Sequence, residues 1–376
     1  MRFNLWEDCN RVPLTELLSF VVDNRGKTVP TAPSGHKLIA TNCVTNNTLF
    51  PVYEKIRYLS EETYQTWFRA HPIPGDILFV NKGTPGRVCL VPDPVDFCIA
   101  QDMIALRADE SKIYPKYLFA VLRSREIQQQ IYNTNVGDVI PHFKKQFLDQ
   151  LLIPIPERSI QESIGDLYYV LSLKAERNQK INDNLQQQAQ AIYSSMFIDN
   201  PDPAWTHGHL SDLITVKYGK DHKKLSDGIY PVYGSGGIMR YVERPLYDKE
   251  SVLIPRKGTL NNVMYVNQPF WSVDTMFYTE MKLPNAAKFV YHFVKAKDLA
   301  SMNAGSAVPS MTTDILNAME VVIPSASVLE EFESLVTPMY EAMEANDAQS
   351  EALSKMRDTL LPKLMSGEID VSAVQL

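Results

Sequence analysis

The sequence is poor in the features that mark secreted, membrane-bound or zinc-binding proteins. Its 376 residues include only 4 cysteines, Cys9, Cys43, Cys89 and Cys98, and none of them forms a C-x-x-C pair. We therefore expect neither a zinc site nor a disulfide framework, and interpret the cysteines as free, mostly buried thiols. No apolar run approaches the roughly 20 residues that span a bilayer. The first residues lack the apolar core of a signal peptide, so we expect a cytoplasmic protein outside the membrane.

The sequence also lacks the motifs of the enzymes that act on DNA or nucleotides. An adenine amino-methyltransferase needs an [N/D]-P-P-[Y/F] segment, and the nearest match, Asn200-Pro201-Asp202-Pro203, departs from it. No G-x4-G-K-[S/T] loop occurs, which excludes a P-loop ATPase. A metallonuclease is not excluded by pattern alone, but no pattern indicates one. We therefore expect no catalytic residues, no metal and no cofactor in this chain.

The net charge of −7 is concentrated at one end of the chain. Residues 326–376 hold 10 acidic and 3 basic side chains, whereas residues 1–156 and 200–325 each carry a net charge of +1. A balanced domain can still present a basic face, so the total charge neither indicates nor excludes a nucleic-acid partner. The exposed side of the acidic segment is expected to face a protein partner or solvent, and three carboxylates represent it: Glu330, Glu331 and Glu333.

The chain reads as an internal repeat of two unlike halves. A shift of 168 residues superimposes glycine, proline and apolar positions: Gly137 on Gly305, Pro141 on Pro309, Leu148 on Leu316, and Ile155-Pro156 on Ile323-Pro324. The same shift aligns two S-x-x-E boxes that begin at Ser159 and Ser327. Such boxes are typical of helix N-termini, because the serine and glutamate side chains bond amides that lack a partner there. The repeat therefore predicts two matched helix starts.

Each box precedes a long segment with apolar residues at 4-3 spacing. Over 160–192 seven of ten such positions are apolar, and over 328–360 eight of ten are. This period predicts two long helices of roughly 38 residues that pair as an antiparallel coiled coil. Asn178 and Asn346 occupy matched seam positions, where a buried asparagine fixes register and partner orientation. The alternative is that both asparagines face solvent.

The segments before the long helices combine short strands, Gly/Pro turns and one short helix each. Strand patterns at 76–80 and 251–254 are each followed by a Lys-Gly-Thr turn, and helical stretches lie at 115–120 and 287–292. The predicted fold class is α+β, with two target-recognition-sized domains separated by two long antiparallel helices in a pseudo-two-fold internal repeat. The assigned boundaries are 1–156 for the first domain, 157–199 for the central helix, 200–325 for the second domain, and 326–376 for the C-terminal helix and tail.

An ordered set of motifs carries a family resemblance. It comprises YLSEETY at 58–64, YPVYGSGGI at 230–238, RKGT at 256–259 and the ending RDTLLPKLMSGEI at 357–369. Together with the repeat layout, these segments resemble the specificity subunits of type I restriction–modification systems over nearly the whole chain. The ending is the most specific match. The two halves resemble different classes of target-recognition domain.

The resemblance implies a non-catalytic subunit that reads an asymmetric, bipartite target in double-stranded DNA. It also implies that methyltransferase subunits dock on the paired helices and supply the S-adenosylmethionine chemistry, and that restriction subunits supply the ATP-driven motor and nuclease. The alternative is a non-catalytic coiled-coil scaffold of a related phage-defence complex. A shift assay with bipartite DNA, with and without methyltransferase subunits, separates the two.

Candidate DNA-contacting residues lie in the turns that follow matched strands. Arginine pairs with guanine and asparagine with adenine, whereas lysines meet phosphates and fix position. The Gly234–Gly237 loop would let the backbone approach a DNA strand; a plain turn is the alternative, and a charged turn can be only solvated. A third loop pair, 134–138 and 302–306, suits DNA and structural roles equally. The candidates are Asn81, Lys82, Thr84 and Arg87 in the first half, and Lys220, Lys223, Lys224, Ser235, Arg256, Lys257, Thr259, Asn261 and Asn262 in the second.

Overall fold

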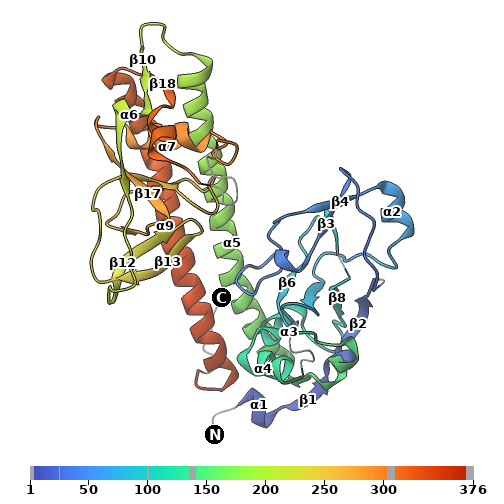
Figure 1. Ribbon diagram of the computed structural model, residues 1–376. Helices are drawn as coiled ribbons and strands as arrows, with labels where there is room; N and C mark the ends of the chain where they lie inside the picture. The colour runs from blue at the N-terminus through green and yellow to red at the C-terminus, as the bar shows by residue number, and fades with distance from the viewer. Residues whose placement is uncertain (1–3, 25, 100, 135–140, 303–309, 370–376) are drawn as a thin grey trace. The chain divides into compact units, whose positions relative to one another are not determined.

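The chain divides into two compact units, each of which combines one α+β domain with parts of two long helices. The computed structural model describes residues 4–24, 26–99, 101–134, 141–302 and 310–369. Unit 1 comprises Met1–Ile181 and Ala345–Leu376, and unit 2 comprises Asn182–Glu344. The long helices are α5 (Arg158–Ser194) and α9 (Ala326–Met365) (Figure 1). Within the described ranges no helix is long and apolar enough to cross a membrane.

Unit 1 is built on two small sheets and a separate strand pair. The four-stranded antiparallel sheet has the order β2-β8-β5-β6, with β2 Leu18–Val22, β8 Met103–Ala108, β5 Ile77–Val80 and β6 Val88–Leu90. The three-stranded sheet has the order β4-β3-β7, with β4 Arg57–Leu59, β3 His36–Ile39 and β7 Phe97–Ile99, and β3 runs parallel to β7. β1 Asn10–Pro13 pairs with β9 Leu152–Ile155. The short helices are α1 Leu5–Asp8, α2 Glu61–Thr66, α3 Pro115–Leu122 and α4 Arg125–Thr134.

Unit 2 repeats this topology strand for strand. Its four-stranded sheet has the order β11-β17-β14-β15, with β11 Ile214–Tyr218, β17 Met276–Met281, β14 Ser251–Pro255 and β15 Met264–Val266. Its three-stranded sheet has the order β13-β12-β16, with β13 Gly237–Val242, β12 Asp227–Gly234 and β16 Trp271–Ser272, the last pair parallel. β10 Thr206–His209 pairs with β18 Glu320–Ile323. The short helices are α6 Leu210–Leu213, α7 Ala287–Lys295 and α8 Thr313–Asn317. The predicted α+β repeat is confirmed.

The repeat has one large difference in length, which explains where the shift of 168 applies. The chain uses residues 23–76 between β2 and β5 in unit 1, but only 219–250 between β11 and β14 in unit 2. The matched strands β9 and β18 keep the offset of 168, whereas elements before them do not. The loop pair 134–138 and 302–306 lies outside the described residues except at Thr134 and Met302.

A short helix covers the four-stranded sheet in each unit. In α3 every residue from Tyr117 to Leu122 is buried, and in α7 every residue from Ala287 to Val294. Such runs, apolar on nearly all sides, are typical of helices enclosed by a sheet on one side and further elements on the other. The four cysteines are free, and Cys43, Cys89 and Cys98 are buried, as the sequence predicts.

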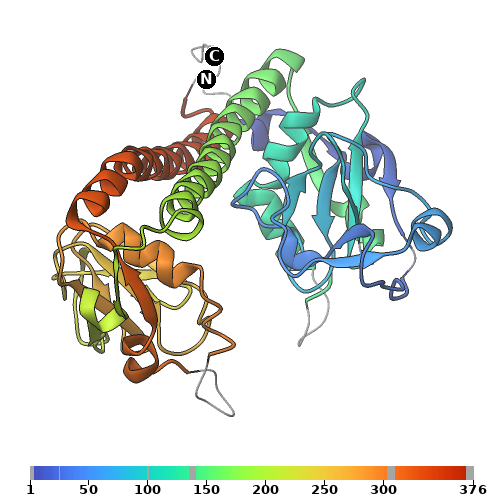
Figure 2. The ribbon, with the colours of Figure 1, turned by 90° about the horizontal axis from the view of Figure 1, so that it is seen from above.

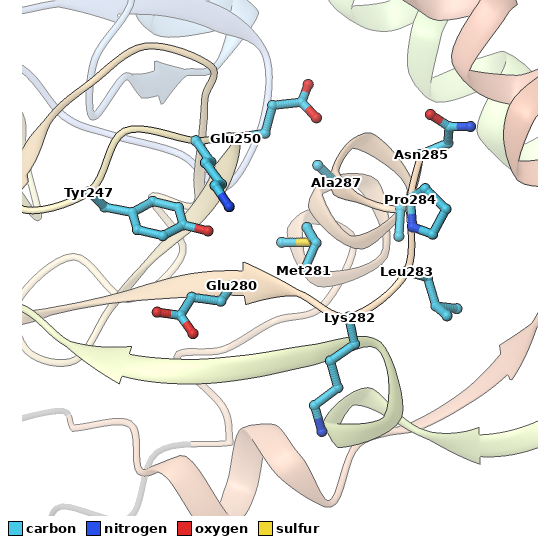
Figure 3. Close-up of a pocket in the computed structure, with 11 residues that line it drawn as sticks. Tyr247, Glu250, Glu280, Met281, Lys282, Leu283, Pro284, Asn285 and Ala287 are labelled. Carbon is cyan, nitrogen blue, oxygen red and sulfur yellow. The ribbon is translucent and has the colours of Figure 1, made fainter.

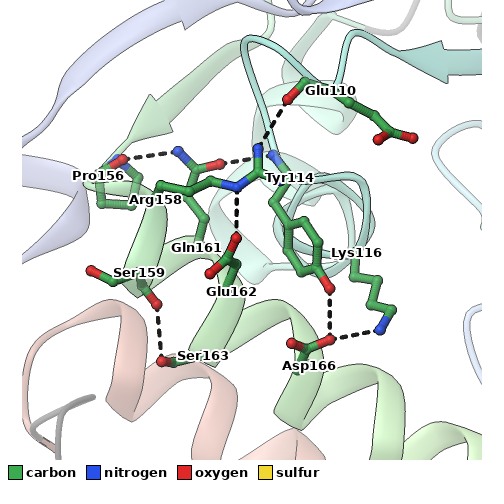
Figure 4. A network of polar contacts seen from close by, with 10 residues as sticks. All are labelled: Glu110, Tyr114, Lys116, Pro156, Arg158, Ser159, Gln161, Glu162, Ser163 and Asp166. Carbon is green, nitrogen blue, oxygen red and sulfur yellow. Dashed lines mark hydrogen bonds and ion pairs between the residues drawn. The ribbon is translucent and has the colours of Figure 1, made fainter.

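Both long helices begin two residues earlier than the S-x-x-E boxes predict. α5 begins at Arg158 and α9 at Ala326, so Ser159 and Ser327 lie inside the first turn. The carbonyls of Glu157 and Ser325 accept the first helical amides instead. The Glu162 carboxylate accepts a hydrogen bond from Arg158 Nε at 2.9 Å rather than bonding the helix start (Figure 4). The cap assignment is wrong, but the two starts remain 168 residues apart.

The contact seam of the long helices lies one residue after the predicted positions. Ile181, Leu335 and Met356 were predicted in the seam, yet they are 46%, 46% and 50% exposed. The heptad period itself is retained by the residues that follow predicted positions. These buried residues are Tyr168, Ser172, Asn182, Ala189 and Tyr193 on α5, and Leu329, Val336, Tyr340, Arg357 and Leu361 on α9. Ile164, Asn178 and Phe332 are buried as predicted.

The long helices run antiparallel (Figure 2). In unit 1 the Arg357 guanidinium lies 5.5 Å from the Tyr168 ring, and in unit 2 Asn182 Nδ2 donates to the Met343 carbonyl at 3.2 Å. A rise of 14 residues along α5 thus matches a fall of 14 along α9. Asn178 lies fully buried between these levels, and its Nδ2 donates to the Asn346 carbonyl at 3.2 Å and to Gln349 Oε1 at 2.9 Å. The two asparagines predicted to set the helix register therefore meet, Asn346 through its backbone.

His292 in α7 connects the second domain to both long helices. Its Nδ1 donates to Gln190 Oε1 on α5 at 2.8 Å, and the Tyr340 hydroxyl on α9 donates to its Nε2 at 2.9 Å. The ring is fully buried, and this burial lowers the pKa of His292 to about 4. The folded protein therefore holds this side chain neutral.

This burial predicts a pH-dependent loss of stability. Between pH 6.5 and 4 the unfolded chain binds a proton at His292 that the folded protein does not, so the His292 contribution is intact above pH 6.5 and is lost as pH falls. We expect a loss of about 2 kcal/mol at pH 5 relative to pH 7.5 from this group. Urea unfolding at both pH values measures it. His292→Gln is the control and should lose less; an equal loss in both proteins would contradict the assignment.

Candidate nucleic-acid interface

In unit 2 three turns and one loop segment meet at one end of the four-stranded sheet. β11 and β14 end there and β17 begins there. The amides of Arg256 and Lys257 donate to the Thr275 carbonyl at 2.9 and 3.2 Å, and the Met311 amide donates to the Arg256 carbonyl at 2.9 Å. We name this end the turn edge of unit 2; it comprises residues 219–224, 234–237, 256–262, 273–275 and 310–311.

Unit 1 has a turn edge of the same construction. The amides of Asn81 and Lys82 donate to the Asp102 carbonyl at 2.9 and 3.3 Å, and the Phe143 amide donates to the Asn81 carbonyl at 2.8 Å. Asn81 thus corresponds to Arg256 and Lys82 to Lys257 by backbone bonding rather than by sequence shift alone. The turn edge of unit 1 comprises residues 23–24, 81–87, 101–102 and 141–145. The sequence predicted these matched turns from their Lys-Gly-Thr segments.

Close backbone contact holds the turns of unit 2 together. Gly258 has a φ of +86°, and a Cβ there would lie 2.7 Å from Ser235 Oγ. Asn262 Nδ2 donates to the Ser235 carbonyl at 2.8 Å. Glycine is needed at 258 both for the left-handed backbone and for the approach of the Ser235 loop. The structure therefore brings three predicted residues, Ser235, Thr259 and Asn262, into one surface.

Arg256 is held in place by its neighbours. Its Nη1 donates to the Asp274 carbonyl at 3.0 Å, and its guanidinium lies 5.5 Å from the ring of Tyr218. Tyr218 is 53% exposed at the last position of β11. Sequence reasoning missed Tyr218, because one exposed aromatic residue at a strand end gives no distinct pattern. A half-buried arginine stacked on an exposed ring is pre-oriented for contact with a planar partner.

Several lysines at the turn edge of unit 2 are exposed and form no ion pair within the described residues. Lys220, Lys223, Lys224 and Lys257 belong to this group. The backbone beneath Lys220 is fixed, since its amide donates to the Ser272 carbonyl at 2.8 Å and Trp271 Nε1 donates to its carbonyl at 2.9 Å. Asn261 is committed to the fold, because its amide group bonds Asp298 Oδ1 and the Ala300 amide. The lysines remain available to an anionic partner.

The turn edge of unit 1 offers a different set of side chains. Lys82 is exposed, whereas Thr84 and Arg87 are half-buried. Asn81 is only 2% exposed and its Nδ2 lies 3.4 Å from the Phe143 carbonyl. Asn81 therefore presents no amide at the surface, and the proposed interface omits it.

Sequence reasoning missed basic residues that the fold adds to this edge. The Asn24 side chain accepts the amide of Arg69 at 3.0 Å and so holds this exposed arginine at the end of β2. Lys144 is exposed beside His142, and Lys145 pairs with Asp23. The Lys144-Lys145 pair directly after Pro141 was a usable signal, because Pro141 falls on Pro309 in the repeat.

The opposite end of the unit 2 sheet has the wrong charge for a DNA contact. A cavity of about 650 Å³ lies there, where β17 ends and α7 begins. The carboxylates of Glu250 and Glu280 line it (Figure 3). Lys217 Nζ pairs with Glu280 Oε2 at 3.4 Å. Because carboxylates repel phosphates, the turn edge is the better candidate for a nucleic-acid interface.

Comparison with known proteins assigns the family. The model of the type I restriction modification DNA specificity domain matches residues 24–187 and 204–332, one match over each unit. The chain therefore belongs to the family of type I restriction–modification specificity subunits, which is a non-catalytic family. This confirms the resemblance read from the motifs.

Individual relatives agree over most of the chain. The MjaIX specificity subunit of Methanocaldococcus jannaschii is 21% identical over 341 residues, covering 79% of this chain and 78% of that protein. The HindI specificity subunit of Haemophilus influenzae is 20% identical over 410 residues, covering 78% and 86%. The crystal structure of the S subunit of a type I system from M. genitalium has a TM-score of 0.62 at 18% identity, covering 96% and 98%, and supports the shared fold.

Proposed function

We propose that the two turn edges read the two halves of an asymmetric bipartite target in double-stranded DNA. The observation that carries this proposal is the pairing of a matched backbone frame with unmatched side chains. Lys82 and Lys257 occupy equivalent positions and are both exposed, which suits phosphate contacts that fix position. The adjoining equivalent positions hold Asn81 and Arg256, and His142 and Ser310, so the two edges present different chemistry.

Sequencing of the methylated genome tests this function directly. A host that expresses this subunit with its methyltransferase partners should carry one methylated motif with two unlike half-sites and a fixed spacer. A palindromic motif would contradict the proposed asymmetry. Bipartite DNA that is bound neither by the subunit nor by its complex would favour the scaffold alternative.

The paired helices are the proposed docking surface for the methyltransferase and restriction subunits. Outside the seam they expose large apolar side chains: Val170, Ile181 and Met356 in unit 1, and Leu335 in unit 2. Exposed apolar positions on a helix suit contact with a protein partner. The acidic face of α9 also suits a protein partner, through Glu330 and Glu331, which are exposed. Glu333 was expected on this face, but it is half-buried and paired with Lys288.

The division of labour predicts an inactive isolated chain. We expect no methyl transfer from S-adenosylmethionine and no ATP hydrolysis by the purified subunit, because both cofactors are proposed to bind the partner subunits. Transfer of a labelled methyl group should begin only when a methyltransferase subunit is added. Transfer above the no-enzyme background by the subunit alone would overturn the adaptor role.

A further inference from the structure

Each domain holds its long helix through a lysine at the second position of its short core helix. This residue is Lys116 in α3 of unit 1 and Lys288 in α7 of unit 2. Lys116 pairs with Asp166 on α5, and Lys288 pairs with Glu333 on α9. The repeat has therefore placed a lysine–carboxylate contact where each domain meets the helix that follows it.

The contact in unit 1 is partly open to solvent. Lys116 Nζ lies 2.6 Å from Asp166 Oδ1, and the Tyr114 hydroxyl donates to the same oxygen at 2.8 Å (Figure 4). The side chains of Lys116 and Asp166 are 36% and 32% exposed. Beside them, a Cβ on Gly165 would lie 2.6 Å from the Tyr117 amide nitrogen. Close backbone packing at Gly165 therefore already fixes the seat of this domain on α5.

The contact in unit 2 is enclosed and more elaborate. The Lys288 side chain is 4% exposed; its ammonium pairs with Glu333 and lies 3.4 Å from Glu250 Oε1. The rings of Tyr265 and Tyr340 lie 5.1 and 5.6 Å from it. Glu333 also accepts a hydrogen bond from Thr337 Oγ1 at 3.0 Å.

The two seats differ because the helix position matched to Gly165 is Glu333. With a glutamate there, the second domain has no glycine contact with α9 at this level, and the orientation depends on the ion pair. A buried ion pair adds little net stability, because desolvation offsets most of the attraction. It is strongly directional, however, because a displaced lysine would leave a carboxylate buried without a partner.

We propose that Lys288 and Glu333 are positioning residues that fix the seat of the second recognition domain on α9 and thereby the spacing between half-sites. This inference rests on the proposed bipartite function. Neither residue lies at the turn edge, so neither is assigned a contact with bases.

The test compares spacing profiles rather than activity alone. The subunit is assembled with its methyltransferase partners and offered duplexes that keep both half-sites and vary the spacer by one or two base pairs. The variant Lys288→Met with Glu333→Gln removes both charges together, so no unpaired charge stays buried. We expect the preference for the native spacer over its neighbours to fall at least tenfold, with the half-site bases unchanged. Glu250→Gln, which keeps the Lys288–Glu333 pair, should reduce the preference by less.

Matched variants separate positioning from general weakening. Lys116→Met, at the equivalent but partly exposed contact, should change the preference less than threefold, and the exposed Lys249→Met should leave it unchanged. Thermal melting is followed for every variant. A lower melting temperature with an unchanged spacing profile would overturn the proposal, and if the double variant does not fold, an unchanged profile for Glu250→Gln would also overturn it. A wild-type complex that methylates no bipartite site would contradict the proposed function instead.

Discussion

Replacing Lys220 and Lys257 together with glutamate should lower the affinity of the subunit for its bipartite DNA by roughly 100-fold at physiological salt. Both side chains are exposed at the turn edge of unit 2. If each meets a phosphate, each replacement removes one counterion-releasing contact and adds a repulsive charge. The plot of log affinity against log salt concentration should become shallower by about two. Filter binding across a salt series measures both quantities.

The control for this experiment is a charge reversal elsewhere on the same domain. Lys249→Glu changes the net charge in the same direction, but Lys249 lines the cavity at the opposite end of the sheet. It should change affinity by less than about threefold, through the overall field alone. Equal losses for the two proteins would mean that the turn edge has no special role. Lys82→Glu should reproduce half of the slope change from unit 1.

The repeat could be predicted because turns and short helices leave marks at fixed spacing. The Lys-Gly-Thr segments mark the ends of β5 and β14, and Gly258 at positive φ shows why the glycine is required. The strand order could not be read in the same way. In each unit it depends on pairings between distant strands, such as β3 with β7, that no local pattern encodes.

The seam was misplaced by one residue because each long helix has two apolar faces. Ile160, Leu167 and Leu360 pack against the core of the first domain, so their apolar character reflects that contact rather than the helix pair. The seam includes Ser172, Asn182 and Arg357, which a hydrophobic count treats as exposed. A stripe wider than a coiled-coil seam has a centre that sequence alone does not locate.

The candidate site shows a similar limit. Lysine is almost never fully buried without a partner, so the exposure of Lys82 and Lys257 was a fair expectation. Asparagine has no such bias: Asn81, Asn261 and Asn262 all bond the fold through their amide groups. Whether an amide serves a loop or a base depends on which backbone groups pass nearby, and the sequence does not specify that.

Inserting one heptad into both long helices should lengthen the preferred spacer without changing either half-site. The insertions belong at one level of the pair, after Gln179 and after Asp347, because Asn178 meets Asn346 there. Seven residues preserve the seam period on both helices and add about 10 Å to each. At about 3.4 Å per base pair, the preferred gap should grow by up to about three base pairs. Methylation of a duplex set with graded spacers measures the shift.

Two further insertions define what the result means. Seven residues in α5 alone would leave its later half one heptad out of step with α9, and should prevent assembly with the methyltransferase subunits. Four residues in both helices would rotate the seam out of contact, since four is not a heptad, and should do the same. If the matched heptad variant assembles and still methylates only the original spacing, the helices do not set the gap. The spacing would then have to be set where each domain is seated on its helix, which is the contact that Lys288 and Glu333 make in unit 2.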